Sequence, residues 1–278
     1  MSAPARPTTL AQALELLARS PGLLPVAGCT DLMVAPAAKR AAVEGVLDLL
    51  AIPELRGIRE TPGGLEIGAA TSFSEIAASP KVAAWFPALA DAASQVGGWQ
   101  IQNRGTLGGN LANASPAGDS LPVLLALDAT LIVASARGER EVPHREFHVG
   151  YRRTALGPGE LIARVLLPRP AAGTRQGFRK VGTRQAQAIS KVAVAMLGRT
   201  EGGVVRELRL GAASVAATPL RLHVAEEAAL GQPIGVAAER AARAATAGVE
   251  PIDDVRSSAE YRRHALATVV RRLVLELA

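Results

Sequence analysis

Residues 104–119, RGTLGGNLANASPAGD, are the most informative segment of the sequence. Its glycines, at positions 105, 108, 109 and 118, permit positive φ angles and close approach of other groups to the backbone. Asp119 ends the stretch, where its carboxylate can accept hydrogen bonds from ribose hydroxyls or cap the following helix. Apolar segments with helical patterns flank the stretch, which disfavours disorder. We therefore predict a long, glycine-rich binding loop, suited to an anion, within residues 97–119.

A second turn, PVAGCTDL at residues 25–32, follows a short apolar run and precedes a segment with a helical pattern. A strand–turn–helix connection of this kind points backbone N–H groups outward, where an anion can accept their hydrogen bonds. An ordinary tight turn uses the same residue types. The segment alone therefore leaves both interpretations open.

The common signatures of hydrolases, nucleoside triphosphatases and metalloenzymes are missing from the sequence. There is no P-loop, no G-x-G-x-x-G and no G-x-S-x-G, and the four histidines lack the spacing of metal ligands. The single cysteine, Cys29, excludes an intrachain disulfide. It also excludes an iron–sulfur cluster or a cysteine-rich zinc site held by this chain alone. A redox cofactor in this chain would therefore be organic.

The composition is that of a globular protein, with 49% hydrophobic and 20% charged residues in 278. The net charge is +6, but the arginines are interleaved with acids and only 3% of residues are aromatic, so we do not expect nucleic-acid binding. The sequence has no apolar run of about 18 residues, so no membrane span is expected. The first residues do not resemble a signal peptide, and we expect a cytoplasmic protein.

The hydrophobic pattern predicts an α+β protein in two domains. A helix capped by Thr8 or Thr9 precedes a strand at Leu23–Ala27, and PRPAAG at 168–173 is the predicted linker. Before the linker we expect strands at 43–50 and 65–70, helices at 71–79, 81–96 and 120–127, and a hairpin at 130–143 that turns at Arg137 and Gly138. After it we expect strands at 177–181, 189–197 and 204–213, then helices at 218–230, 236–247 and 258–277.

The glycine-rich stretch also carries a family resemblance. GTLGGNLANASPAGDSLP, residues 105–122, resembles the FAD-binding motif of the medium, flavoprotein subunit of molybdenum hydroxylases, which include the xanthine dehydrogenase and carbon monoxide dehydrogenase families. PVAGCTDL is similar to the other FAD loop of that family, where Gly or Asn is usual at the position of Cys29. Further matches follow in order at residues 180–192, 217–221 and 254–263, so the resemblance covers nearly the whole chain.

The resemblance implies a two-lobed FAD-binding domain of the PCMH type at residues 1–168, with lobes at roughly 1–55 and 56–168, followed by a smaller α+β C-terminal domain at residues 174–278. By matching positions, it implies that FAD is held by Pro25, Val26, Ala27, Gly28, Cys29, Thr30, Asp31, Leu32, Thr106, Leu107, Gly108, Gly109, Asn110, Asn113, Asp119, Ile162 and Lys180. The residues alone give Ile162 and Lys180 other interpretations, as a strand core residue and a surface charge.

The resemblance also implies the partners and the role of the chain. Members of the family work with a large molybdopterin-binding subunit and a small subunit that carries two [2Fe–2S] clusters, in what we expect to be a dimer of heterotrimers. Electrons reach FAD from the clusters and pass to NAD⁺, oxygen or another acceptor. Two alternatives stay open: a flavin-free scaffold that docks the other subunits, and a stand-alone FAD oxidase.

Overall fold

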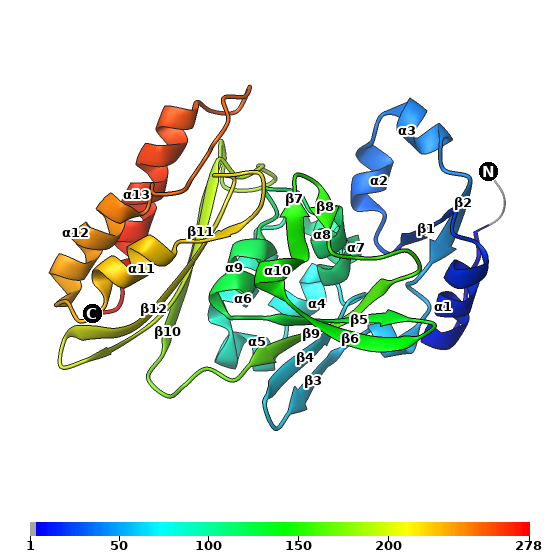
Figure 1. Cartoon of the computed structure of the whole chain (residues 1–278), viewed down its shortest axis with the longest axis horizontal. Coiled ribbons are helices and arrows are strands. Elements are labelled where there is room, and N and C mark those ends of the chain that lie inside the picture. The colour runs from blue at the N-terminus through cyan, green and yellow to red at the C-terminus, as the bar shows by residue number, and fades with distance from the viewer. Residues whose placement is uncertain (1–3) are drawn as a thin grey trace.

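The structure is a computed structural model that describes residues 4–278. The chain forms three adjoining parts along its long axis: a small N-terminal lobe, a central lobe and a C-terminal domain (Figure 1). Helices and strands are mixed in each part, which confirms the predicted α+β class. Within residues 4–278, no helix is both long and apolar enough to cross a membrane.

The first lobe is built around a parallel pair of strands. Strand β1 (Leu23–Val26) pairs in register with β2 (Gly45–Asp48), and α1 (Leu10–Arg19) packs beside them. The side chain of Thr9 accepts from the Gln12 N–H and caps α1, as predicted. The lobe also contains α2 (Thr30–Val34), α3 (Ala37–Ala41) and the 3₁₀ helix η1 (Pro53–Leu55).

The second lobe contains a five-stranded sheet with all neighbours antiparallel, in the order β3-β4-β9-β5-β6. Its strands are β3 (Ile58–Thr61), β4 (Gly64–Gly68), β5 (Thr130–Ser135), β6 (Gly138–Pro143) and β9 (Leu161–Pro168). Its helices are α4 (Phe73–Ala77), α5 (Pro80–Trp85), α6 (Pro87–Ser94), α7 (Trp99–Arg104), α8 (Leu107–Asn113), α9 (Ser120–Ala126) and α10 (His144–Phe147). A small hairpin, β7 (His148–Gly150) and β8 (Arg153–Thr154), lies beside α8 (Figure 1).

The C-terminal domain is a four-stranded antiparallel sheet, in the order β10-β11-β12-β13, with helices on one face. Its elements are β10 (Arg175–Val181), β11 (Val192–Glu201), β12 (Val204–Ala213), β13 (Leu220–Arg221), α11 (His223–Ala229), α12 (Ile234–Ala244) and α13 (Ala259–Leu275). Because side chains alternate along a strand, Val192 and Val194 face the helices while Ala193 and Ala195 belong to the core of the second lobe.

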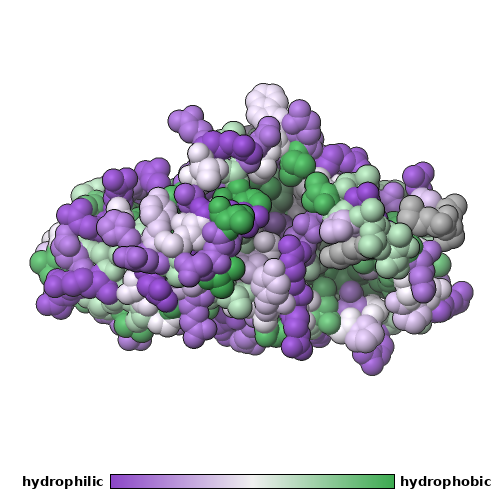
Figure 2. Space-filling model, turned by 90° about the horizontal axis from the view of Figure 1, so that it is seen from above, coloured by the Kyte–Doolittle hydropathy of each residue, from purple (hydrophilic) through white to green (hydrophobic). Residues whose placement is uncertain are grey.

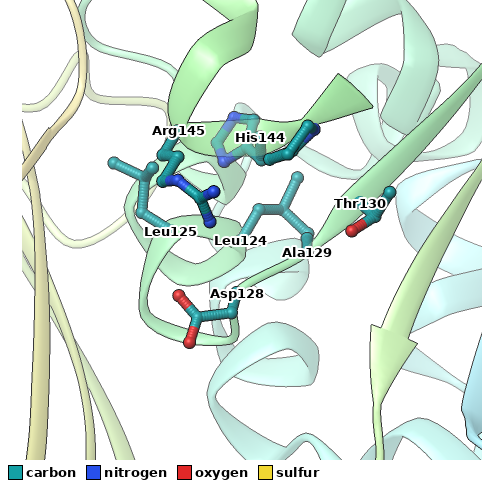
Figure 3. Close-up of a pocket in the computed structure, with 8 residues that line it drawn as sticks. Leu124, Leu125, Asp128, Ala129, Thr130, His144 and Arg145 are labelled. Carbon is teal, nitrogen blue, oxygen red and sulfur yellow. The ribbon is translucent and has the colours of Figure 1, made fainter. Parts of the chain in front are cut away.

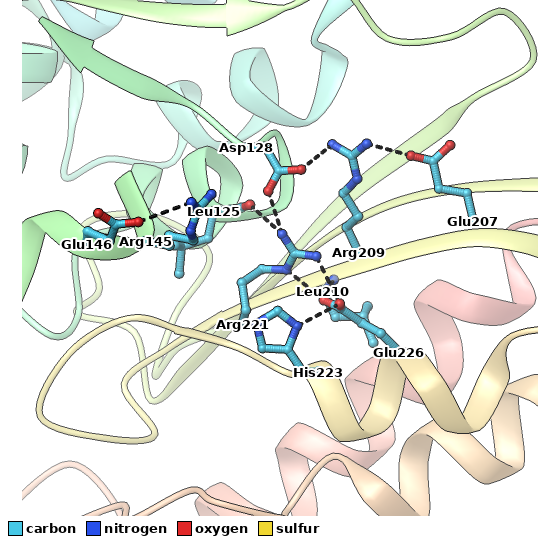
Figure 4. Close-up of polar contacts among 10 residues, drawn as sticks. All are labelled: Leu125, Asp128, Arg145, Glu146, Glu207, Arg209, Leu210, Arg221, His223 and Glu226. Carbon is cyan, nitrogen blue, oxygen red and sulfur yellow. Dashed lines mark hydrogen bonds and ion pairs between the residues drawn. The ribbon is translucent and has the colours of Figure 1, made fainter. Parts of the chain in front are cut away.

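Close packing and charge both join the C-terminal domain to the second lobe. A Cβ placed on Gly211 of β12 would lie 2.0 Å from the Pro122 carbonyl oxygen, so the strand meets α9 at the backbone. At the edge of this contact, Asp128 lies 2.7 Å from both the Arg209 and the Arg221 guanidinium groups. Arg221 also pairs with Glu226 of α11, which continues the network into the domain (Figure 4).

Several predicted elements were wrong, and each has a local cause. The expected helix at 81–96 is broken between α5 and α6 because Pro87 lacks an N–H and starts a new helix. The predicted loop at 97–119 contains α7 and α8. The segment at 218–222 is not helical, since Leu220–Arg221 pairs with β12. Strand β11 begins at Val192 rather than at 189, and β3 and β9 were not predicted.

His144 is buried beside a cavity of about 60 Å³ between α9 and α10 (Figure 3). Its side chain is fully enclosed, and neither ring nitrogen has a hydrogen-bond partner in the described part of the chain. Burial, with a smaller contribution from His148, lowers the pKa of His144 from 6.5 to about 3. Folding therefore requires the neutral imidazole.

We predict that acid destabilises the fold through His144. The unfolded chain binds a proton at this residue below about pH 6.5, whereas the folded chain binds it only near pH 3. The folded state therefore loses stability as the pH falls from 6.5 toward 3. The contribution reaches up to about 1.4 kcal/mol per pH unit. Urea unfolding between pH 7 and 4 should show a shallower pH dependence for His144→Leu than for the parent. Replacing the exposed His264 with Gln is the control, and an equal slope in all three proteins would refute the assignment.

Candidate functional site

The first segment of the candidate site, residues 25–32, runs from the end of β1 into α2. Cys29 adopts the left-handed conformation, with φ 58° and ψ 8°, at the position before α2. This agrees with the residue types expected there, since glycine and asparagine tolerate that conformation best, and a cysteine costs about 1 kcal/mol or more. Burial and the nearby Asp48 raise the pKa of the Cys29 thiol, although Arg104 acts in the opposite direction. Cys29 is therefore not an activated nucleophile.

The backbone of this segment offers free hydrogen-bond donors. Within residues 4–278, the N–H groups of residues 28–32 have no protein acceptor. The segment is half-exposed, and α2 buries none of its side chains. A row of unpaired N–H groups at a strand–helix turn is a site for an anion.

The second segment, residues 106–110, begins a helix instead of forming a loop. Thr106 caps α8, and its side-chain oxygen accepts from the Gly109 N–H at 3.1 Å. The N–H groups of Leu107 and Gly108 donate to the carbonyls of Thr71 and Ala69. Residues 107–110 therefore use their N–H groups inside the protein, in contrast to residues 28–32.

Two glycines of the second segment have different surroundings. A Cβ on Gly108 would lie 2.6 Å from the Ala69 Cβ, so this glycine lets α8 pack on the chain beneath it. A Cβ on Gly109 would approach only the Thr106 hydroxyl, at 2.9 Å. Gly109 therefore presents open space on the outer side of α8, where a ligand can approach the backbone.

The two segments meet at Gly28. A Cβ placed there would lie 1.8 Å from the carbonyl oxygen of Arg104, far closer than any side chain allows. Only a glycine permits the turn after β1 to lie against the end of α7. This contact brings together residues 25–32 and 106–110, which are about 80 positions apart in the sequence.

Asp119 and Lys180 form a buried ion pair across the domain boundary. The ammonium group lies 2.7 Å from one carboxylate oxygen, and the Ser190 hydroxyl donates to the other at 2.5 Å. Lys180 is therefore not a surface charge, with 7% of its side chain exposed. Burial raises the pKa of the Asp119 carboxyl, although Lys180 and Ser190 act in the opposite direction. Asp119 occupies the N-cap position of α9 but makes no capping bond with its side chain.

The remaining expected residues lie around these segments. Asn110 accepts from the Ser120 hydroxyl at 2.8 Å, and Asn113 at the end of α8 accepts from Arg152 at 3.1 Å. Ile162 is buried in β9, as in its alternative interpretation as a strand core residue. The next residue in β9, Ala163, accepts a backbone bond from Ala69, the residue that lies beneath Gly108.

Sequence reasoning missed two residues of this region, Arg152 and Ser190. Ser190 lies within a matched segment, but its bond to Asp119 joins positions 71 apart and leaves no local pattern. Arg152 occupies a turn whose only local feature is a tyrosine–arginine–arginine run. Neither role can be read from neighbouring residues.

We predict that Gly28→Ala destabilises the protein, by about 1–3 kcal/mol or more, because the new methyl group overlaps the Arg104 carbonyl. Thermal or urea unfolding measures the change. Gly235→Ala in α12 is the matched control, since nothing lies within 4 Å of its added Cβ. If the two variants are equally stable, the two segments do not meet at Gly28.

Comparison with known proteins places the chain among flavoprotein subunits. Residues 2–170 match the FAD binding domain in molybdopterin dehydrogenase, and residues 178–277 match the CO dehydrogenase flavoprotein C-terminal domain. The xanthine dehydrogenase FAD-binding subunit of Escherichia coli O157:H7 is 34% identical over 98% of this chain and 94% of its own length. The carbon monoxide dehydrogenase medium chain of Hydrogenophaga pseudoflava is 34% identical over 84% of this chain and 81% of its own.

A solved structure agrees with the sequence comparisons. A chain of the carbon monoxide dehydrogenase from Hydrogenophaga pseudoflava that lacks the Mo-pyranopterin moiety of its molybdenum cofactor superposes with a TM-score of 0.93. It is 33% identical, and the match covers 97% of this chain and 94% of that chain.

Proposed function

The chain belongs to the family of FAD-binding subunits of molybdenum hydroxylases, and we propose that it binds FAD between the segments 25–32 and 106–110. The observation that carries this proposal is the row of free N–H groups on residues 28–32, held against the end of α7, together with the open backbone at Gly109. The FAD pyrophosphate carries two negative charges, and such a row stabilises them without a metal.

The two segments would act on different parts of the cofactor. Gly28 to Leu32 would donate backbone hydrogen bonds to the pyrophosphate, and Pro25 to Ala27 would border it. Thr106 to Asn110 would supply a close surface on the other side, where the N–H groups of Leu107 to Asn110 are already used within the protein. Asp119 has both oxygens bonded, yet a carboxylate keeps further lone pairs for a ribose hydroxyl. Asn113, Ile162 and Lys180 would border the site.

FAD, when bound, supplies the redox chemistry, since its isoalloxazine can accept and release electrons one or two at a time. The chain itself contributes binding and orientation. With one cysteine in its sequence, it cannot ligate an iron–sulfur cluster alone. The chain is thus an electron-transfer subunit, and the clusters and the molybdenum centre belong to its partners.

The assembly follows from the relatives, which are the medium chains or FAD subunits of multi-subunit dehydrogenases. Such chains work with large and small subunits. We propose that this chain assembles with a molybdopterin-binding subunit and a [2Fe–2S] subunit as a dimer of heterotrimers in the cytoplasm. NAD⁺, oxygen or another acceptor would take the electrons.

The domain division that we propose is a two-lobed FAD domain at residues 1–168, with lobes at about 1–55 and 56–168, and a C-terminal domain at residues 174–278. The two family matches, at 2–170 and 178–277, support a boundary at this position. The separate core of the C-terminal helices also supports it. The buried pair of Asp119 and Lys180 crosses the boundary, so the second domain would help to form the FAD site.

We predict that the purified full-length chain carries FAD. Its absorption spectrum should show the bands of oxidised flavin, and heating should release FAD rather than FMN. A colourless protein that takes up no FAD, alone or with its partner subunits, would favour the docking scaffold instead. A stand-alone oxidase would turn over substrate without the molybdenum subunit, and we expect no such turnover.

We predict that Gly109→Val abolishes FAD retention while the protein stays folded. The branched side chain would fill the open space on the outer side of α8, where the added Cβ approaches only the Thr106 hydroxyl, at 2.9 Å. Flavin absorbance per mole of protein measures the effect, and circular dichroism checks the fold. Gly235→Val, on α12, is the control. Normal FAD content in Gly109→Val would mean that the cofactor lies elsewhere.

A further inference from the structure

The β7–β8 hairpin is fixed to the helix that begins the second FAD segment. At its base, the Ala155 N–H donates to the Phe147 carbonyl at 2.8 Å, and Phe147 is fully buried. The Nε2 atom of His148 lies 3.1 Å from the Leu111 carbonyl oxygen of α8. The base of the hairpin is therefore held against α8, and its tip, residues 151–152, has a defined position.

The tip of the hairpin directs one arginine toward both FAD segments. The Arg152 guanidinium donates to Asn113 Oδ1 on α8 at 3.1 Å and lies 3.8 Å from Asp31 Oδ2 on α2. Asp31 belongs to the first lobe and Asn113 to the second. Arg152 thus joins the two lobes at the side-chain level, in addition to the backbone contact of Gly28 with Arg104.

The backbone of Arg152 indicates that the side chain has a specific purpose. Its φ is 50°, in the left-handed region that glycine occupies at lower cost. A non-glycine residue in such a position is strained, which makes its side chain a candidate for a role at the site. Seen from above, the molecule is largely hydrophilic, with separate hydrophobic side chains near the middle of this face (Figure 2).

We propose that Arg152 is a latch that holds the two FAD-binding segments together and slows the release of FAD. The inference rests on the proposed function. Arg152 is a positioning residue: it acts through Asp31 and Asn113, which are expected to border the cofactor. Its guanidinium has five N–H donors, so it can keep these contacts while a negative charge lies nearby.

The expected effect is moderate because the latch is partly exposed. The side chains of Arg152 and Asp31 are 41% and 51% exposed, and pairs of this kind contribute at most about 1 kcal/mol. That corresponds to about a fivefold change in a rate or equilibrium constant. Salt should weaken the ion pair and reduce the difference.

The test compares FAD release from the full-length parent chain with release from three variants. Timed separation of protein from free flavin after dilution gives the dissociation rate. Arg152→Ala should release FAD about fivefold faster. Arg152→Gly should release FAD as fast as Arg152→Ala does. It should be at least as stable as Arg152→Ala in thermal unfolding, because glycine suits the positive φ. Arg153→Ala is the matched control: it removes the same charge one position along the hairpin and should behave as the parent.

A double mutant separates a latch from an independent contact. If Arg152 acts through Asp31, adding Asp31→Asn to Arg152→Ala should not accelerate release further. Equal release rates in the parent, Arg152→Ala and Arg152→Gly would overturn the latch, as would fully additive effects. If the parent chain binds no FAD at all, the proposed function fails first, so the two failures are distinguishable.

Discussion

The contact of Gly28 with the Arg104 carbonyl is the constraint on which the rest of the site depends. It is a purely steric requirement, since the space at Gly28 is smaller than a methyl group. Because of it, the turn after β1, with the free N–H groups of residues 28–32, lies against the end of α7, directly before α8. An apolar cluster shared by the two lobes, which includes Leu47, Ala134 and Ala163, supports the same arrangement.

Different segments of the site supply the hydrogen-bond donors and the open space for a ligand. Residues 28–32 carry the free backbone N–H donors. The N–H groups of residues 107–110 already donate within the protein, where they pack and cap α8. Gly108 faces inward onto Ala69, and Gly109 faces outward. Consecutive glycines in one motif thus serve opposite purposes, one for packing and one for access to the backbone.

Local patterns predicted much of this structure. The cap at Thr9, the hairpin at 130–143 and the strand that becomes β11 all follow from neighbouring residues. The glycine-rich stretch was predicted to be a loop and its helices were missed, because polar residues and glycines conceal the capping of α8 by Thr106.

The features that sequence reasoning missed depend on distant partners. From its neighbours in the sequence, Lys180 can be interpreted as a surface charge. The structure shows that it is paired with Asp119, from another part of the chain. Arg152 likewise could not be identified without its contacts to Asp31 and Asn113, which are distant in the sequence. The family resemblance implies that Lys180 borders the cofactor, whereas the structure shows a residue that is buried in a pair with Asp119.

The joint between the second lobe and the C-terminal domain has a consequence for how the chain moves. Residues 168–173 have the composition of a flexible linker, yet the surfaces on either side share one core through Phe178 and Ala193, and Gly211 lies against Pro122. The two domains therefore cannot swing about this segment as about a hinge. Amide hydrogens in β11 and α9 would exchange together, in a single cooperative opening, rather than as two independent units.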